Sequence, residues 1–386
     1  MKALFYISSS IGGDDILYGL LELGIDASRS ETIVELDKLS DDQIEKVSDE
    51  SKEYDFVITR NFSINVAEGC HISGVPYVAW CYDSPVMPLY RKEAFYKTNY
   101  IFAFDKKHIE RLREEGLTNV YYQPLAANMI KAGRIRITDR DLETYARDIS
   151  FVGSTYHMGY YNSLSKEIPE ECKKECEELF ESNLCRWDRN RNVFNKLSEP
   201  VIEYFYARLS KEEREDHTIS DRYLTELLVL VYELTSRERI HLLNECAQAF
   251  KTIIHTHNPD KYEGVIKAEI RGPLKWLSDE LFRVYAASKI NINLTMRSIE
   301  TGVPQRIFDI LSVGGCVFSN YQEEAEELFI PDREIVLFKS VEEFMDKAKY
   351  YIDHEKERLE IGARGYLKVR DIYNYPNAIK NILSKL

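Results

Sequence analysis

Short apolar runs alternate along the first part of the chain with segments in which apolar residues recur every three or four positions. The apolar runs lie at residues 3–8, 54–59, 75–80, 100–104 and 120–123. Runs that are apolar on both faces and alternate with helices are typical of a parallel sheet covered on both sides. This pattern predicts an α/β domain at residues 1–145.

A second series of predicted strands, alternating with helices, follows the first. Its members lie at residues 148–154, 252–255, 265–270, 289–293, 316–319 and 334–338. A long polar region, at about residues 160–250, follows the first of these runs and has the charge pattern of solvated helices. The sequence therefore predicts a second parallel-sheet domain at residues 146–370 with a helical insertion. A last helix, within residues 371–386, has one apolar face.

Length and charge narrow the function classes. The 386 residues exceed what one hydrophobic core usually supports, which agrees with two domains. The chain has 51 Lys and Arg against 65 Asp and Glu, a net charge of -14, which argues against nucleic-acid or anionic-membrane binding but allows a small anionic ligand where arginines gather. No apolar run approaches the roughly 20 residues of a membrane span, and no signal peptide is evident. We expect a cytoplasmic protein without a membrane span or nucleic-acid partner.

The richest segment for chemistry is residues 290–320. Its polar and turn-forming positions are Asn293 at a strand end, Arg297 and Glu300 in a loop, Pro304 at a helix start, and Arg306 and Asp309 within that helix. Ligands of doubly wound sheets bind outside the carboxyl ends of the strands, so this segment should face a cleft between the two domains.

A phosphate site is the hypothesis that these residue types support. The start of a helix offers unpaired N–H groups to an anion. Arg297 and Arg306 could add forked donors to a diphosphate, and Asp309 could accept hydrogen bonds from ribose hydroxyls. The alternative is that Arg306 and Asp309, three positions apart, form an ordinary ion pair on the helix surface.

Two further segments hold candidate residues for catalysis. Asp83 follows an apolar strand and precedes Ser84-Pro85, where a carboxylate could act as general base or simply cap a turn. Tyr156 and His157 follow a strand that ends at Gly153 and could reach the donor sugar or the leaving phosphate, although an isolated histidine is more often structural. Gly12-Gly13 is expected to give room for a turn or for an acceptor, because no phosphate-loop motif surrounds it.

Several motifs together resemble one family. The segments are Val303-Pro-Gln-Arg-Ile-Phe-Asp-Ile-Leu-Ser-Val-Gly-Gly315, Trp80-Cys-Tyr-Asp-Ser-Pro85 and Ile149-Ser-Phe-Val-Gly-Ser154. They look like the spore-maturation, CgeB-like glycosyltransferases of the GT-B fold. The resemblance implies two Rossmann-like doubly wound domains, with the last helix returning to the first. It also implies a hexosyltransferase that moves a sugar from a nucleotide diphosphate sugar, most commonly a UDP-sugar, to a hydroxyl on a protein or surface glycan.

The resemblance also implies roles for single residues. Asp309 would bind the ribose, Arg306 or Arg297 would face the diphosphate, and Gly153 and Ser154 would bring backbone N–H groups to the same phosphates. The family's other acidic position, eight residues earlier, is a threonine in this chain, and the nearest acid is Glu300.

No metal or other cofactor is expected. The Asp-x-Asp sequence Asp139-Arg-Asp141 resembles a metal-binding motif, but it lies in a basic linker and not at the end of an apolar strand. Two matters stay open at this point. The chain could be a non-catalytic GT-B-fold subunit of a glycosylation complex, and it could associate with a second copy or with a partner glycosyltransferase.

Overall fold

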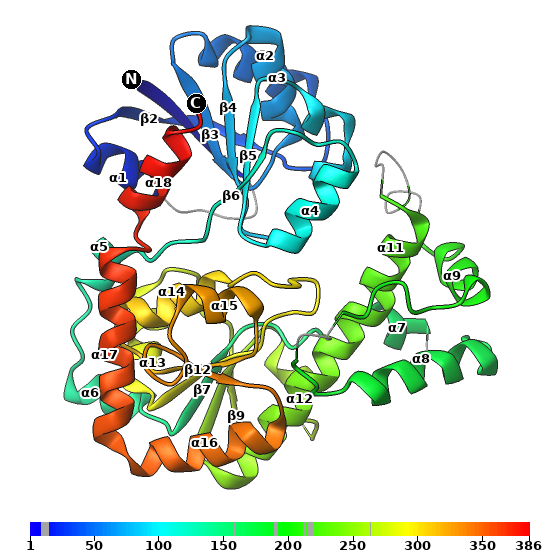
Figure 1. The fold of residues 1–386 in the computed structure, drawn as a ribbon, viewed down its shortest axis with the longest axis vertical. Helices are drawn as coiled ribbons and strands as arrows, with labels where there is room; N and C mark the ends of the chain where they lie inside the picture. The colour runs from blue at the N-terminus through cyan, green and yellow to red at the C-terminus, as the bar shows by residue number, and fades with distance from the viewer. Residues whose placement is uncertain are drawn as a thin grey trace.

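Two six-stranded parallel sheets form the molecule, one above the other in Figure 1. The computed structural model describes residues 1–8, 15–157, 159–164, 166–188, 192–210, 214, 219–262 and 264–386. Helices cover the sheets, so the predicted pair of Rossmann-like domains is confirmed. The predicted boundary near residue 145 falls between the last strand of the first sheet and the first strand of the second.

The first sheet has the strand order β2-β1-β3-β4-β5-β6. Its strands are β1 (Lys2–Ser8), β2 (Asp26–Val34), β3 (Phe56–Arg60), β4 (Tyr77–Trp80), β5 (Asn99–Ala103) and β6 (Val120–Tyr122). The helices are α1 (Asp15–Glu22), α2 (Asp41–Ser51), α3 (Ile64–Ser73) and α4 (Lys106–Glu114), with 3-10 turns η1 (Met87–Tyr90) and η2 (Lys92–Phe95). The order reverses between β1 and β3, which is where such sheets bind ligands.

The strand β2 was not predicted from the sequence. It lies at the edge of the sheet, and only two of its nine residues, Ser30 and Val34, are buried. A strand that pairs on one side and faces solvent needs no apolar run, so its sequence shows none.

The second sheet has the order β12-β11-β10-β7-β8-β9 and reverses between β7 and β10. Its strands are β7 (Ile149–Val152), β8 (Thr252–His255), β9 (Glu269–Arg271), β10 (Ile290–Asn293), β11 (Val317–Asn320) and β12 (Val336–Phe338). The other elements are α5 (Met129–Ala132), α6 (Asp139–Tyr145), η4 (Pro259–Tyr262), α13 (Asp279–Ala287), α14 (Gln305–Ser312), α15 (Glu323–Leu328), α16 (Val341–Asp353) and α17 (Glu355–Asp371).

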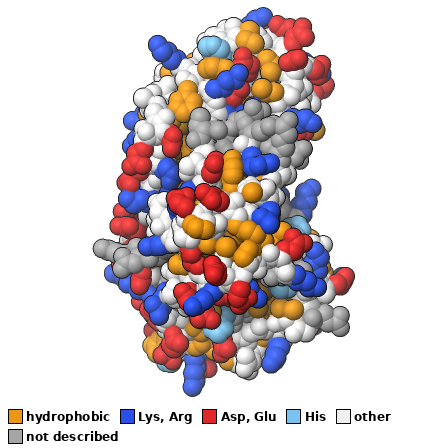
Figure 2. All heavy atoms as spheres, turned by 90° about the vertical axis from the view of Figure 1, so that its right-hand side faces the viewer, with side chains coloured by type: hydrophobic (Ala, Val, Ile, Leu, Met, Phe, Trp, Pro, Cys, Tyr) orange, Lys and Arg blue, Asp and Glu red, His pale blue; other side chains and the backbone are white. Residues whose placement is uncertain are grey.

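The predicted helical insertion follows β7 and projects to the right in Figure 1. Its elements are α7 (Tyr160–Leu164), α8 (Glu170–Asn183), α9 (Glu199–Tyr206), α11 (Asp221–Glu226), a π-helical turn η3 (Leu227–Val231) and α12 (Tyr232–Ala249), which leads back to the sheet. One buried apolar cluster contains residues of both the first sheet and the insertion. The insertion therefore belongs to the second domain in sequence and packs against the first. On the side of the molecule where the insertion projects, acidic and basic side chains are interspersed (Figure 2).

The end of the chain returns to the first domain, as predicted. Helix α17 leads to α18 (Tyr375–Leu383), which packs against α1, and the two termini lie close together in Figure 1. The contact is tight because Gly19 has no side chain: a Cβ there would lie 2.5 Å from Ile379 Cδ1. Within the described part of the chain, no helix is both long and apolar enough to cross a membrane.

Candidate functional site

A cavity of about 630 Å³ lies between the two domains, at the carboxyl ends of both sheets. The first domain contributes the segments after β3 and β4, and the second contributes those after β7 and β10 and the start of α14. Six of the predicted site residues line this cavity: Asp83, Gly153, Tyr156, Pro304, Arg306 and Asp309. Both sheets reverse their strand order at this edge, so the cavity lies where the topology predicts it.

The start of α14 points into the cavity. Pro304 is its N-cap residue, and Pro304, Gln305 and Arg306 all line the cavity wall. The first N–H groups of a helix have no partner within the helix and carry the positive end of its dipole. This end of the cavity is therefore suited to an anion.

Arg306 is held in place by a polar contact beneath it. Its Nη1 donates to Asn293 Oδ1 at 2.8 Å, and Asn293 Nδ2 donates in turn to Thr295 Oγ1 and Ser319 Oγ, both at 2.9 Å. Asn293 is buried, so the structure gives it the role of orienting Arg306 from below.

Gly153 permits the close approach of that arginine. A Cβ at this position would lie 2.5 Å from Arg306 Nη2, and the φ angle of 154° is rarely adopted by residues with a side chain. Ser154, next in the chain, accepts the Tyr156 N–H at 3.1 Å through its Oγ. The predicted glycine thus gives room to a guanidinium as well as to a ligand.

A second arginine at the cavity, Arg239 on α12, was not predicted from the sequence. It is only 3% exposed, and its guanidinium donates to the carbonyl oxygens of Ser154 and Leu294. Burial, reinforced by the nearby charge of Arg306, lowers the pKa of Arg239 to about 10 and outweighs the opposing effect of Tyr156, so the side chain stays charged at neutral pH. The sequence signal that could have revealed it is the position of Arg239 at helical spacing from the apolar residues Leu242, Leu243 and Cys246, which form the buried face of α12.

Asp309 lies at the same end of the cavity but is already engaged. Its Oδ1 accepts from Gln305 Nε2 at 2.8 Å, and its Oδ2 accepts from Trp276 Nε1 at 3.3 Å. Burial raises the pKa of Asp309 to about 7, although both hydrogen bonds act in the opposite direction. Among the ion pairs of the described residues there is none between Arg306 and Asp309, so the alternative of a surface pair is wrong.

Asp83 enters the cavity from the first domain. Asn61 Nδ2 donates to Asp83 Oδ2 at 2.6 Å, while Asn61 Oδ1 accepts the Tyr82 N–H at 2.7 Å. The side chain of Asp83 is exposed to the cavity. The surrounding protein raises its pKa by desolvation, opposed by the Asn61 hydrogen bond and by the charge of Arg60.

Arg60 joins the two domains beside the cavity and was also not predicted. Its guanidinium carbon lies 4.1 Å from the ring centre of Trp276, from the second domain, and 4.6 Å from that of Tyr82, from the first. Its Nη2 pairs with Asp15 at 3.1 Å. A cation between two aromatic faces is a favourable arrangement, and it fixes Trp276, the donor to Asp309.

Three predicted residues lie elsewhere. Arg297 is turned into the base of the insertion, where it pairs with Glu238 and donates to the carbonyl oxygens of Asn183 and Arg186 at 2.9 and 3.0 Å. Its side chain is buried, so the expectation that it faces the diphosphate is not met in this structure.

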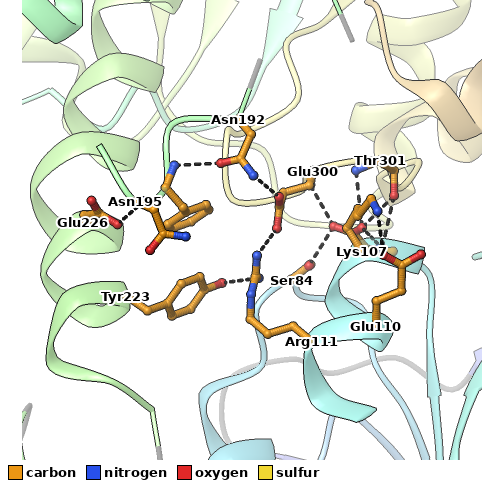
Figure 3. A network of polar contacts seen from close by, with 12 residues as sticks. Ser84, Lys107, Glu110, Arg111, Asn192, Asn195, Tyr223, Glu226, Glu300 and Thr301 are labelled. Atoms are coloured by element: carbon orange, nitrogen blue, oxygen red, sulfur yellow. Dashed lines mark hydrogen bonds and ion pairs between the residues drawn. The ribbon is translucent and has the colours of Figure 1, made fainter. Parts of the chain in front are cut away.

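Glu300 belongs to the domain interface. It pairs with Arg111 of α4 and accepts from Asn192 Nδ2 of the insertion at 2.9 Å (Figure 3). Its backbone N–H donates to Asp105 Oδ2 of the first domain at 2.8 Å. Arg111 Nη1 also donates to the Tyr223 hydroxyl at 3.0 Å. The predicted donor-binding acid is therefore part of an interdomain network.

His157 is not part of the cavity wall. Its ring packs beside that of Tyr262, with centres 5.7 Å apart. Asp141 of the Asp-x-Asp sequence forms a capping box with Thr138 at the start of α6. Within the described residues, no group of three or more His, Cys, Asp or Glu side chains is placed to hold a metal. Gly12 and Gly13 lie outside the described residues.

Comparison with known proteins supports the same fold. Residues 238–384 match a family model described as glycosyl transferase-like. No curated protein sequence matches the chain significantly. HepE of Anabaena in complex with UDP-glucose superimposes with a TM-score of 0.55, 12% identity and full coverage of both chains.

Two other solved structures have a similar fold. A glycosyltransferase from Rickettsia africae has a TM-score of 0.56 and 11% identity, over 99% of this chain and 97% of the other. An α-glucosyltransferase bound to UDP-glucose and DNA with an abasic site has a TM-score of 0.58 and 9% identity, over 100% and 98%. The chain thus has the fold of GT-B glycosyltransferases, while the closer resemblance to CgeB-like proteins stays a prediction.

Proposed function

We propose that the protein is a glycosyltransferase that moves a sugar from a nucleotide diphosphate sugar to a hydroxyl acceptor. One observation carries the proposal. Two fixed guanidinium groups, on Arg239 and Arg306, and the start of α14 meet at one cavity, and the other domain presents Asp83 to that cavity. A volume of about 630 Å³ is in the range of ligand-binding cavities.

The donor would lie along the second domain. Its diphosphate would be held by Arg239, Arg306 and the first N–H groups of α14, and a ribose hydroxyl would donate to Asp309 in place of Gln305. A uridine base is the favoured choice, because structural neighbours were solved with UDP or UDP-glucose.

The acceptor would approach Asp83. As the acceptor oxygen attacks the anomeric carbon, Asp83 would take the hydroxyl proton, and the bond from the anomeric carbon to the diphosphate would break, with its electron pair leaving on the nucleotide. Because its pKa is raised, Asp83 is a stronger base than a carboxylate in water. The two guanidinium groups and the helix start would stabilise the charge that develops on the leaving group, so we propose that no metal is required. The acceptor hydroxyl would be on a protein or glycan, in the cytoplasm.

Calorimetry with UDP tests the donor site. Arg306→Ala should weaken UDP binding by about 10- to 150-fold, the effect of losing a charged hydrogen-bond donor. Arg140→Ala, an exposed arginine on α6, is the matched control and should bind as the wild type does. Equal UDP affinity for Arg306→Ala and the wild type would refute the assignment.

A non-catalytic binding subunit is the second candidate, because Glu300, the nearest match to the family's first acid, lies at the domain interface. Incubation with a panel of nucleotide sugars in EDTA separates the two functions. A transferase releases nucleotide steadily, by transfer or by slow hydrolysis, and loses that release in Asp83→Asn. A binding subunit would bind UDP but would release no nucleotide from the nucleotide sugars.

A further inference from the structure

The cavity has two sides of different chemistry. The apolar side chains on one side, among them Leu281 and Tyr285 of the second domain, belong to the larger buried cluster, which contains residues of both sheets. Those on the other side belong to the buried cluster shared by the first domain and the insertion, or pack against it: Val86, Met87, Leu227, Tyr232 and Met296. We call these five residues the acceptor wall, because Asp83, the proposed base, lies only three positions before Val86 in the chain.

Charged groups are distributed unequally between the two sides. Among the described residues that line the cavity, the charged ones are Asp83, Arg239, Arg306 and Asp309. The last three surround the proposed donor position, so Asp83 is the one charged group beside the acceptor wall. A phosphate-bearing acceptor such as DNA would need cations there. Polar side chains also line the cavity near Asp83, but Asn61 is engaged by Asp83 and by the Tyr82 N–H, and Ser84 donates to Asp105. Few groups are therefore left to pair with the several hydroxyls of a sugar acceptor, and unpaired hydroxyls against apolar side chains are unfavourable.

The insertion supplies part of this wall. Leu227 begins the π-helical turn η3, and Tyr232 is the first residue of α12 after it. Such turns inside α-helices are frequent at functional sites because the extra residue changes the direction of the side chains. The ring of Tyr232 stands edge-on to Tyr156, with centres 5.2 Å apart and planes at 88°. The charge of Asp83 helps to raise the pKa of Tyr232, after burial and Tyr156, so the two side chains are near each other.

The base also fits one class of hydroxyl. A carboxylate is a weak base. General-base catalysis is most effective when the pKa of the hydroxyl that loses its proton is not far above the pKa of the base. Phenols, with a pKa of about 10, come closer to this condition than other hydroxyl groups. Aromatic rings pack well against the thioethers and tyrosine ring of the acceptor wall.

We infer that the acceptor of the proposed transfer is a phenol, either a free aromatic compound or a tyrosine side chain of a polypeptide, and that Leu227 and Tyr232 of the insertion determine this specificity. The inference rests on the proposed function. The phenolic proton passes to Asp83, the phenolic oxygen bonds to the anomeric carbon, and the nucleotide diphosphate leaves with the electron pair of the broken bond. The product is an aryl glycoside.

Binding of 2-naphthol in the presence of saturating UDP, followed by naphthol fluorescence, tests the wall without knowledge of the sugar. Leu227→Ala should weaken naphthol binding by about 15- to 60-fold, the effect of losing two to three buried methylene contacts. It should leave UDP affinity unchanged. Leu228→Ala is the matched control, since Leu228 is in the same turn, packs against the same cluster and does not line the cavity. Equal effects of the two substitutions would overturn the specificity role.

Transfer is tested with the nucleotide-sugar panel and three acceptors, with products weighed by mass spectrometry. The inference requires that 2-naphthol or a tyrosine-containing peptide gains a sugar more efficiently than methyl glucoside does. Whether 2-naphthol or the peptide is the better acceptor shows whether the phenol comes from a free aromatic compound or from a tyrosine side chain. Preference for methyl glucoside overturns it. If UDP binds but neither phenol binds or reacts, the inference alone fails. If UDP itself does not bind, the proposed function fails with it.

Discussion

The substitution Gly153→Ala tests whether the loop after β7 acts through Arg306. A Cβ at residue 153 would lie 2.5 Å from Arg306 Nη2, 3.4 Å from Arg306 Cζ and 3.5 Å from Phe151 Cζ. Carbon atoms normally approach other heavy atoms to about 3.5 Å, so the guanidinium would have to move by about 1 Å. A rigid displacement of that size is enough to break the 2.8 Å hydrogen bond from Arg306 Nη1 to Asn293.

Two effects of different size follow from this geometry. Because the obstacle is the mobile end of a long side chain, the global cost should come mainly from the φ angle of 154°, about 1–3 kcal/mol of unfolding free energy. Loss of an oriented, charged donor to the diphosphate should cost about 1.5–3 kcal/mol, or about 10- to 150-fold in the dissociation constant for UDP.

Calorimetry with UDP and urea denaturation measure the two effects separately. Gly272→Ala is the control, because a Cβ there meets nothing within 4 Å. If Gly153 acts through Arg306, then adding Gly153→Ala to Arg306→Ala should change UDP affinity little further. Wild-type affinity in Gly153→Ala, or a full additional loss in the double variant, would refute the reasoning.

Three other substitutions have defined outcomes. Arg297→Ala should lower the unfolding free energy by about 3–5 kcal/mol, because the buried Glu238 would keep its charge without an opposing charge beside it. The folded variant should still bind UDP, and a loss of UDP affinity would return Arg297 to the donor site. Asp309 has a pKa of about 7 in the folded protein, above its unfolded value, so it stabilises the fold at low pH, and this stabilisation is lost as pH rises from about 4 to 7. In urea denaturation, the unfolding free energy of Asp309→Asn should lack this pH dependence. Identical pH profiles for the variant and the wild type would contradict the prediction. Gly302→Ala should lower thermal stability by about 1–3 kcal/mol, because its Cβ would lie 2.7 Å from Phe104 O in the other domain, and an unchanged melting temperature would contradict this.

The sequence predicted the parts of the fold that rest on periodicity. Buried strands such as β4 and β12 are apolar on both faces, and this is visible without a structure. β2 was missed because one edge of it needs no partner and its faces are largely exposed. The cleft was predicted from topology alone, because parallel strands that reverse order leave a crevice at their carboxyl ends.

Side-chain direction could not be predicted in the same way. Arg297 and Glu300 lie in the predicted loop, and residue type and spacing suited both to a diphosphate site. The loop turns Arg297 toward Glu238 and Glu300 toward Arg111, and both partners come from segments distant in sequence. Arg239 was missed for a different reason. It enters the cavity from α12, at the end of the insertion, and the strand pattern of the sequence does not show which face of that helix meets the sheet.

These differences change the charge balance of the cavity. With Glu300 at the domain interface, the donor side holds Arg239, Arg306 and the start of α14 against one carboxylate, Asp309. Because burial raises the pKa of that carboxyl to about 7, it is partly protonated at neutral pH. The donor side is therefore positive within a chain whose net charge is -14. A small diphosphate can enter such a positive site, whereas a polyanion would also have to contact the outer surface of a protein whose overall charge is negative.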